Sequence, residues 1–242
     1  MTGAVLSLHR YPVKSMRGEP VEQLEVDDRG AAGDRSYSVL DFHKGSWRRF
    51  TARQAPRLLA WQATYGPVYP DLTDPPLPLL RAPDGSEHSW GDPELADVLE
   101  ADLGRPVRLH RDAAGQQDLE RSILVTLERT RAGLQSELGA VELDLQRFRP
   151  NLHIALDGAC AFAETGWEGM RLRVGEALLE LLHPCVRCVI PTRDPNGGPE
   201  RRPELLRHLA RAHDTSFGIN ARAAHPSRAW VRVGDPVELL TS

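Results

Sequence analysis

The residues best suited to chemistry lie in residues 183–195, where two positions separate Cys185 from Cys188. Such a pair can pack as small hydrophobic side chains, form half of a zinc site or act as a thiol-redox couple. Redox pairs usually open a helix, because the helix N-terminus lowers the thiol pKa. The Val-Ile-Pro run at residues 189–191 instead favours a strand leaving the motif.

A zinc site would need further ligands. Structural zinc normally binds four Cys or His side chains, often from two paired clusters. The chain has no second cysteine pair, and His183, His208 and His213 stand at no recognisable ligand spacing. Packing, metal binding and redox chemistry therefore all remain open for the two thiols.

The neighbours of Cys188 favour its thiolate form. Arg187 and Arg193 bracket the cysteine, and positive charges stabilise a thiolate. Thr192 adds a hydroxyl group, and the Asp-Pro-Asn-Gly-Gly run at residues 194–198 predicts a turn that exposes the end of the strand. A thiolate beside cationic and hydroxyl donors suits a soft metal or an anionic cofactor.

Two further polar clusters flank predicted strands. Lys14 and Ser15 end the first strand, and Arg35 follows in a Gly-Asp-Arg turn. Arg149 and Asn151 stand just before a later strand. Taken singly, each fits a solvated charge, a salt bridge or a turn residue. Together they form the cationic set that a phosphate-bearing ligand requires.

The composition limits the partners of the chain. With 40% hydrophobic and 26% charged residues, the 242-residue chain has the usual composition of a globular protein. Its net charge of -4 argues against non-specific nucleic-acid binding, so any anion site must be a local cluster. The basic residues are almost all arginine, with Lys14 and Lys44 as the only lysines.

No membrane span or targeting signal is predicted. The most apolar stretch, residues 177–190, is interrupted by charged side chains and is too short to cross a bilayer. The first residues enter a strand-like pattern with no signal-peptide features, so we expect a cytoplasmic protein. Three cysteines, Cys160, Cys185 and Cys188, are too few for a disulfide framework.

Most of the chain reads as short strands bounded by Gly, Pro or Asp. Strands are expected at residues 5–13, 23–27, 37–42, 58–65, 107–110, 123–126 and 152–156. Two hairpins are predicted at residues 172–182 and 231–240, because each has an alternating run, a Gly-acid turn and a second apolar run.

Three helices are expected among these strands. They cover residues 93–103, capped by Asp92, residues 130–138, capped by Thr130, and residues 203–213. Residues 66–91 are expected to be irregular. Few helices among many short strands predict a mainly β fold of the α+β class, with a barrel favoured over a doubly wound sheet. A domain boundary is expected near residues 111–117, where Ala and Gly interrupt the pattern.

Several of these motifs resemble those of MOSC-domain proteins. Tyr-Pro-Val-Lys-Ser at residues 11–15 and Gly-Asp-Arg at residues 33–35 resemble the N-terminal β domain that precedes MOSC domains. Matches to the MOSC domain itself lie at residues 148–151, 166–175, 185–195 and 233–237. The resemblance spans nearly the whole chain in the family's order. It implies an N-terminal β-rich domain at residues 1–112 and a MOSC β-barrel at residues 113–242.

The resemblance also implies a cofactor and its ligands. In relatives that reduce amidoximes, the second cysteine of the pair coordinates molybdenum, so Cys188 is the expected metal ligand and catalytic residue. The expected cofactor is molybdenum-molybdopterin, with no pyridoxal phosphate. Asn220 stands where some relatives have a cofactor-contacting tyrosine, and Thr130 is the match in a turn that is richer in hydroxyl groups in relatives. The full set of expected cofactor contacts is Lys14, Ser15, Arg35, Thr130, Arg149, Asn151, Thr192 and Asn220.

The implied activity is reduction of a small N-hydroxylated compound, which loses its oxygen with two electrons and two protons. The protein would contribute orientation and electrostatics. The chain has no ferredoxin-like cysteine cluster and no Gly-x-Gly-x-x-Gly fingerprint, so a separate donor, a ferredoxin or a flavin reductase, is expected. No nucleic-acid or membrane partner is expected.

One alternative is a non-catalytic cofactor carrier or a sulfur-transfer protein using a Cys188 persulfide. A zinc-stabilised β domain is the other.

Overall fold

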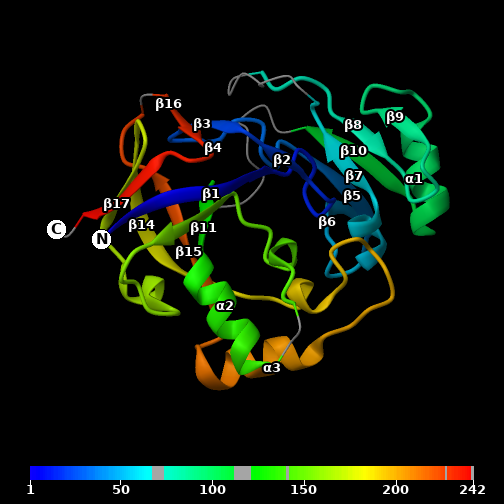
Figure 1. The fold of residues 1–242 in the computed structure, drawn as a ribbon. Coiled ribbons are helices and arrows are strands. Elements are labelled where there is room, and N and C mark those ends of the chain that lie inside the picture. The colour runs from blue at the N-terminus through cyan, green and yellow to red at the C-terminus, as the bar shows by residue number, and fades with distance from the viewer. Residues whose placement is uncertain (67–73, 112–120, 140–141, 227, 241–242) are drawn as a thin grey trace.

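The computed structural model describes residues 1–66, 74–111, 121–139, 142–226 and 228–240, and strands dominate the described fold (Figure 1). Seven strands close into a barrel in the order β12-β11-β15-β14-β13-β17-β1, because β1 also pairs with β12. Neighbouring barrel strands run antiparallel except β11 and β12, which are parallel. The barrel strands are β1 (Thr2–Arg10), β11 (Ile123–Leu127), β12 (Leu152–Leu156), β13 (Arg171–Val174), β14 (Ala177–Val186), β15 (Ser216–Ala223) and β17 (Pro236–Leu240).

Alternating apolar side chains fill the barrel. In β13, Leu172 and Val174 are buried, while the alternating Arg171 and Arg173 are exposed. In β14, Leu179 and Leu181 are buried in the same period of two, as expected for a strand with one face turned to a core. Val5 of β1 belongs to the same core cluster, so the first strand of the chain is an integral part of the barrel.

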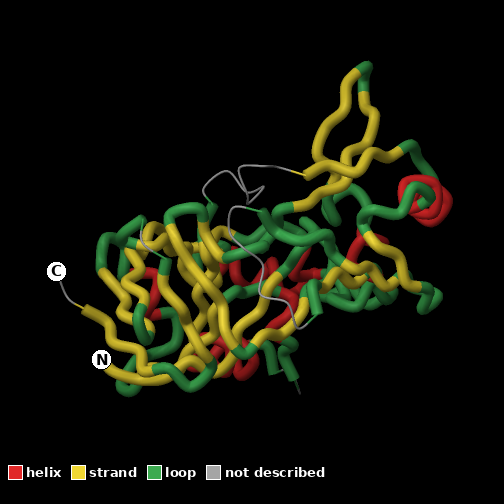
Figure 2. The backbone as a smooth tube through the Cα atoms, turned by 90° about the horizontal axis from the view of Figure 1, so that it is seen from above, coloured by secondary structure: helices red, strands yellow, loops and turns green. Residues whose placement is uncertain are grey.

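A second lobe, which we call the N-terminal lobe, is formed mainly by described residues between 37 and 111. It has its own core around Tyr37, Phe50 and Trp61, which Val13 and Met16 join. It lies on the side of the molecule opposite the two termini (Figures 1 and 2). Its elements are β5 (Tyr37–His43), β6 (Ser46–Phe50), η1 (Pro56–Ala60), β7 (Gln62–Thr64), β8 (Leu79–Arg81), β9 (Glu87–Ser89), α1 (Leu95–Leu103) and β10 (Val107–Arg111). Strand β2 (Glu19–Val21) pairs with β1, and a small sheet joins β3 (Gln23–Asp27), β4 (Gly30–Ala31) and β16 (Ala229–Arg232).

Two helices, α2 (Glu128–Glu137) and α3 (Pro203–Ala212), lie together at the lower side of the barrel in Figure 1. A third cluster of buried side chains joins them, and within it the rings of Phe148 and Phe217 stack with centroids 3.6 Å apart. Short 3-10 turns, η2 (Leu145–Arg147), η3 (Ala163–Gly166) and η4 (Ile190–Thr192), connect these elements.

Several predicted elements are confirmed. The strands at residues 23–27 and 152–156, the hairpin formed by β13 and β14, and the mainly β class with few helices all appear. Helix α3 begins with Pro203, and α1 ends at Gly104, whose φ of 68° is typical of a glycine C-cap. The predicted boundary at residues 112–113 lies within residues 112–120, outside the described residues.

The predicted hairpin at residues 231–240 is wrong. Strand β16 pairs with β3, whereas β17 pairs with β13 and β1. The Val233 amide donates to Glu22 O, and Gly234 then turns with a φ of 86°. The turn therefore sends the chain from one sheet into another.

Three further expectations need correction. Residues 58–65 are not one strand but η1 followed by β7, because Pro56 at the first position favours a 3-10 turn. Residues 66–91 are not irregular throughout, since β8 and β9 form a hairpin around Gly85. Helix α2 begins at Glu128 with Leu127 as N-cap, so Thr130 lies inside the helix and does not cap it.

Candidate functional site

A cavity of about 350 Å³ lies between the barrel and the N-terminal lobe, and Cys188 forms part of its wall. We call it the thiol cavity. No acidic side chain is among the described residues that line it. Its basic lining residues are Lys14, Arg35, Arg49, Arg53, Arg149 and Arg187. In a chain of net charge -4, this concentration of positive charge makes a local anion site.

Cys185 lies near the end of β14, and Cys188 follows the strand by two residues. The strand expected to leave the motif at residues 189–191 is wrong, because residues 190–192 form the 3-10 turn η4. The register of β14 against β15 shifts between Leu181 and Val186, which bends the strand as bulges do. Arg187 donates from Nη1 to the Cys185 sulfur at 2.9 Å and from Nη2 to Phe148 O at 2.7 Å. No side-chain hydrogen bond joins the Cys188 sulfur to any described residue. Of the two half-buried thiols, Cys188 therefore retains its sulfur for a ligand.

Three predicted site residues adopt left-handed backbone conformations. Ser15, Arg35 and Arg149 have φ angles of 72°, 49° and 55°. Such angles cost roughly 1–2 kcal/mol for residues other than glycine. They persist where the surrounding structure enforces them, and they concentrate at functional sites. All three residues line the thiol cavity.

The buried ring of Tyr11 holds two of these arginines. The guanidinium carbons of Arg35 and Arg149 lie 5.1 and 4.2 Å from the ring centroid. Arg149 also donates to Met16 O at 2.7 Å, which ties the barrel to the N-terminal lobe. Asp34, fully buried, pairs with Arg35 and accepts the Tyr11 amide at 2.8 Å. Burial raises the pKa of Tyr11, so its hydroxyl stays protonated and acts as a donor.

Asn151 is fully buried behind the cavity wall. Its Oδ1 accepts from Arg35 at 3.3 Å and from the Leu124 amide at 3.2 Å, and its Nδ2 donates to His9 O at 3.3 Å. The side chain thus fixes Arg35 against β1 and β11. Within this structure Asn151 positions a lining residue and does not itself line the cavity.

The remaining predicted contacts divide into two groups. Asn220 lines the thiol cavity, and its Oδ1 accepts from Ser122 at 3.3 Å. Thr192 is buried in its own turn and donates to Val189 O at 2.7 Å. Thr130 is a buried residue of α2, and its hydroxyl donates to Glu164 at 2.7 Å. The structure brings neither threonine to the cavity wall.

Sequence reasoning missed several residues of the site. Arg49, Thr51 and Arg53, in β6 and the loop after it, line the cavity from the N-terminal lobe. They stand in no motif, so the sequence alone does not single them out. Tyr11 and Asp34 could have been found, because they lie in the Tyr-Pro-Val-Lys-Ser and Gly-Asp-Arg runs.

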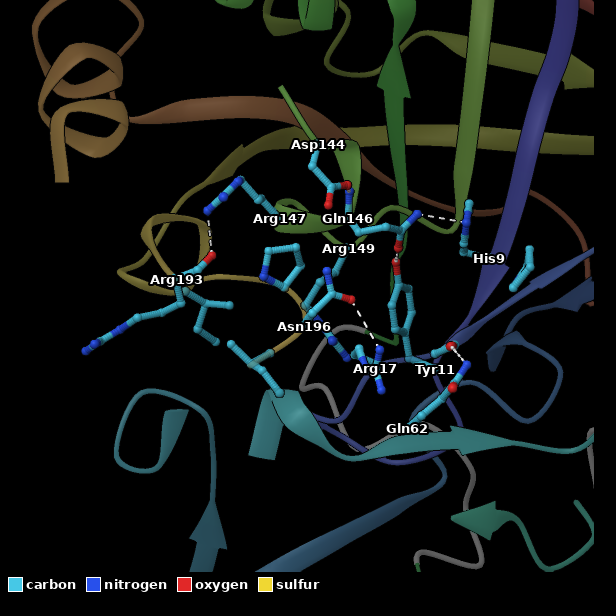
Figure 3. A pocket seen from close by; sticks show the side chains of 15 residues that line it. His9, Tyr11, Arg17, Gln62, Asp144, Gln146, Arg147, Arg149, Arg193 and Asn196 are labelled. Carbon is cyan, nitrogen blue, oxygen red and sulfur yellow. Dashed lines mark hydrogen bonds between the residues drawn. The ribbon is translucent and has the colours of Figure 1, made fainter. Parts of the chain in front are cut away.

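A second cavity of about 180 Å³ shares Arg149 and Ile190 with the thiol cavity (Figure 3). Gln146 links two of its lining residues, because it accepts from the Tyr11 hydroxyl at 2.9 Å and donates to His9 Nε2 at 2.7 Å. Desolvation, reinforced by His153 and opposed by Asp144, lowers the pKa of His9 to about 4. A neutral His9 is the form that can accept this hydrogen bond.

Two models of known protein families match the chain. The model of the MOSC domain matches residues 93–238, and the model of the MOSC N-terminal beta barrel domain matches residues 2–89. The chain belongs to the MOSC domain family. The described residues that line its thiol cavity come from both matched segments of this MOSC protein, since Lys14 and Arg53 lie in the first and Cys188 and Asn220 in the second.

Named relatives of the MOSC protein include mitochondrial amidoxime-reducing components. It is 29% identical to mitochondrial amidoxime-reducing component 1 of Xenopus laevis, over 99% of this chain and 82% of that protein. The human protein of the same name is 28% identical, over 98% and 83%. Molybdenum cofactor sulfurase of Solanum lycopersicum is 29% identical over 68% of this chain, but only 21% of that longer protein is covered.

A solved structure supports the fold of the MOSC protein. The crystal structure of the YuaD protein from Bacillus subtilis superposes with a TM-score of 0.51 at 14% identity, covering 99% of this chain and 96% of that one. At this identity the likeness concerns the fold alone. No helix in the described part of the MOSC protein has the length and apolar character needed to cross a bilayer.

Proposed function

We propose that this MOSC protein binds a molybdenum-molybdopterin cofactor in the thiol cavity, with Cys188 as the metal ligand, and reduces N-hydroxylated compounds. The observation that carries the proposal is the Cys188 sulfur at the wall of a cavity with six basic and no acidic lining side chains among the described residues. The names of the amidoxime-reducing relatives, which match almost the whole chain, support the same class of activity.

The residues present fit such a group. A thiolate is a ligand that soft metals prefer, and a phosphate-bearing pterin needs several cationic donors when it leaves water. The buried Nε of Arg187 forms no hydrogen bond with any described residue, so it offers an unused donor at the cavity. Lys14, Arg35 and Arg149 would hold the phosphate, and Asn220 would offer an amide to the pterin.

Each part of the site has a distinct task in this proposal. When bound, the cofactor supplies two-electron chemistry: the N–O bond of the substrate breaks, and the oxygen leaves as water after uptake of two protons and two electrons. Cys188 fixes the metal at the cavity wall. Arg187 holds Cys185 and thereby keeps that second thiol from competing. Tyr11 and Asp34 keep the arginines aimed at the anion.

The electrons come from a separate redox protein in this proposal, a ferredoxin or a flavin reductase. The three cysteines of the chain are too few for an iron–sulfur cluster, which usually takes four. We expect the purified protein to need an added donor, and direct turnover with a nicotinamide nucleotide alone would refute this part.

The test is cofactor content and turnover of protein made in a host that synthesises the cofactor. Reduction of benzamidoxime with an artificial donor should fall on the order of 100-fold or more in Cys188→Ser, because a metal ligand is lost. Cys160→Ser, at an exposed thiol outside the cavity lining, is the control and should retain activity. Full turnover and full molybdenum content in Cys188→Ser would contradict the proposal.

A second candidate is a carrier that binds the cofactor without catalysis or passes sulfur as a Cys188 persulfide. The match to molybdenum cofactor sulfurase over 68% of the chain supports this second candidate function. Bound molybdenum without any turnover would support the carrier. A persulfide on Cys188 detected by mass spectrometry, and absent in Cys188→Ser, would support sulfur transfer.

A further inference from the structure

Away from the thiol cavity, three metal-binding side chains converge where α2 meets α3. Glu137 is the last residue of α2, His208 lies in α3, and His213 follows α3 directly. The Nε2 atoms of both histidines lie 2.7 Å from the same carboxylate oxygen of Glu137. The three candidate ligand atoms all lie within 4.8 Å of one another.

The end of α3 brings the two histidines to one side. Residues five apart on a continuous helix point in different directions, unlike residues three or four apart. His213, however, leaves the helix with a φ of -140° while its amide still donates to Leu209 O. Its ring stacks on Phe162 with centroids 3.4 Å apart and a 10° interplanar angle. The ring therefore turns back toward His208 in a fixed orientation.

Thr130 supports this arrangement. Its hydroxyl accepts the Phe162 amide at 2.8 Å and donates to the buried Glu164 carboxyl. Phe162, on whose ring the His213 imidazole stacks, is thus anchored through its amide to Thr130 of α2. A stacked, anchored imidazole loses little entropy when it binds a ligand, so the cluster is well prepared for one.

We infer that Glu137, His208 and His213 form a zinc site, with water as the fourth ligand. Two imidazoles and one carboxylate are a ligand set that Zn²⁺ accepts in tetrahedral geometry. Mg²⁺ and Ca²⁺ prefer all-oxygen ligands and are excluded by the two nitrogen donors. The side chains are 38%, 28% and 14% exposed, so a metal ion reaches them without opening the fold.

Zinc at this position cross-links the two helices. Leu134 of α2 and Leu205 and Leu209 of α3 share the cluster that contains Phe148 and Phe217. Helix α3 is tied to η4, the turn after Cys188, because Arg202 donates its amide to Thr192 O at 2.8 Å. The ion would stabilise the packing of α2 against α3. The inference holds whether or not the thiol cavity binds a cofactor.

The test is zinc binding by chelator-treated protein, measured by calorimetry and thermal unfolding. We expect one Zn²⁺ per chain and a rise in melting temperature of roughly 5 °C when free zinc exceeds the dissociation constant 100-fold. His208→Gln and Glu137→Gln should each weaken binding on the order of 100-fold, since one of three ligands is lost. Ca²⁺ and Mg²⁺ should have no effect.

Two controls make the result specific. His225→Gln, at an exposed histidine outside the cluster, should bind zinc like the unmodified protein. A variant with Cys160, Cys185 and Cys188 replaced by serine should also keep the site, and Co²⁺ bound to it should give tetrahedral visible absorption without a thiolate charge-transfer band. Absence of binding, or binding abolished by the serine replacements and unchanged in His208→Gln, would overturn the inference.

Discussion

At the scale of single residues, the hydrogen bonds that line the second cavity depend on proton positions. Tyr11 donates to Gln146, and Gln146 donates to His9. This direction requires a neutral His9, because a protonated imidazole has no acceptor. Burial and the nearby His153 lower the pKa of His9 against the opposing charge of Asp144, so the neutral form prevails. Protonation of His9 would remove the acceptor of the Gln146 amide. It would thereby disturb the hydrogen bond that Gln146 accepts from the Tyr11 hydroxyl, whose ring contacts the two arginines.

The pKa of His9 predicts acid sensitivity. It is about 4 in the folded protein against 6.5 for an ordinary histidine. Between these values the unfolded chain binds a proton that the folded chain does not, so the free energy of unfolding falls as pH is lowered from 6.5 to about 4. The loss is complete below that range and amounts to roughly 3 kcal/mol.

Denaturant unfolding at several pH values checks this. His9→Gln should flatten the fall in stability between pH 6.5 and 4, while His43→Gln, at an exposed position, should leave it unchanged. Equal slopes in all three proteins would show that His9 is not the group responsible.

The candidate site was predictable at this scale only in part. Lys14, Ser15, Arg35, Arg149, Asn220 and Cys188, all predicted from motifs, line one cavity. Motifs identify residues at strand ends, but they do not tell a lining side chain from one that supports it. Asn151 supports Arg35, and the hydroxyls of Thr130 and Thr192 bond within the fold. Whether a residue lines the cavity or supports a lining residue depends on the direction of its side chain, and the spacing of residues in the sequence does not determine that direction.

At the scale of elements, the turn at residues 194–198 is anchored to the N-terminal lobe. Residues 194–198 form the predicted turn, and the Asn196 amide donates to Asp194 at 2.8 Å. Arg17 donates both to Asn196 at 3.2 Å and to Ala60 O of η1 at 3.4 Å. Gly197, with a φ of 76°, packs so closely on Ala60 that an added Cβ would lie 2.4 Å from it.

Gly197→Ala should therefore destabilise the protein for two reasons. A positive φ costs an alanine about 1–2 kcal/mol, and the collision with Ala60 adds roughly 1–3 kcal/mol. Gly85→Ala is the matched control, because Gly85 has a φ of 90° with open space around it. Chemical denaturation should show a larger loss for Gly197→Ala, and equal losses would refute the close contact.

Elements whose bounds are set by their own residues were predicted well. Strands whose pairing depends on segments far away in the sequence were not. Pro203 and Gly104 mark helix ends by their own backbone preferences. The alternation in residues 229–240 is real, but β3, β13 and β1 decide where each strand pairs. The spacing of His208 and His213 likewise gave no metal signal, because the helix ends between them.

At the scale of the whole molecule, the chain is acidic overall but basic at the junction of its two parts. Lys14, one of its two lysines, lines the thiol cavity, whereas Lys44 lies exposed in the turn between β5 and β6. Like charges gathered between two lobes repel one another, so an anion bound there should stabilise the whole protein.

Cofactor-free protein should accordingly melt at a higher temperature in phosphate than in chloride at equal ionic strength. A gain of about 1 kcal/mol corresponds to roughly 2–4 °C for a chain of this size. Lys14→Gln should reduce the gain, and Lys44→Gln should preserve it. If both variants respond like the unmodified protein, phosphate does not act through the thiol cavity.

The place of β1 between β12 and β17 has a consequence for how the protein is made. During translation β1 leaves the ribosome long before β12 and β17 exist, and only β2, which pairs with the last residues of β1, can form early. Barrel closure joins segments far apart in sequence, and such topologies fold slowly. A chaperone that shields the emerging first strand would therefore raise the yield of this protein more than that of one whose strands pair in order of synthesis.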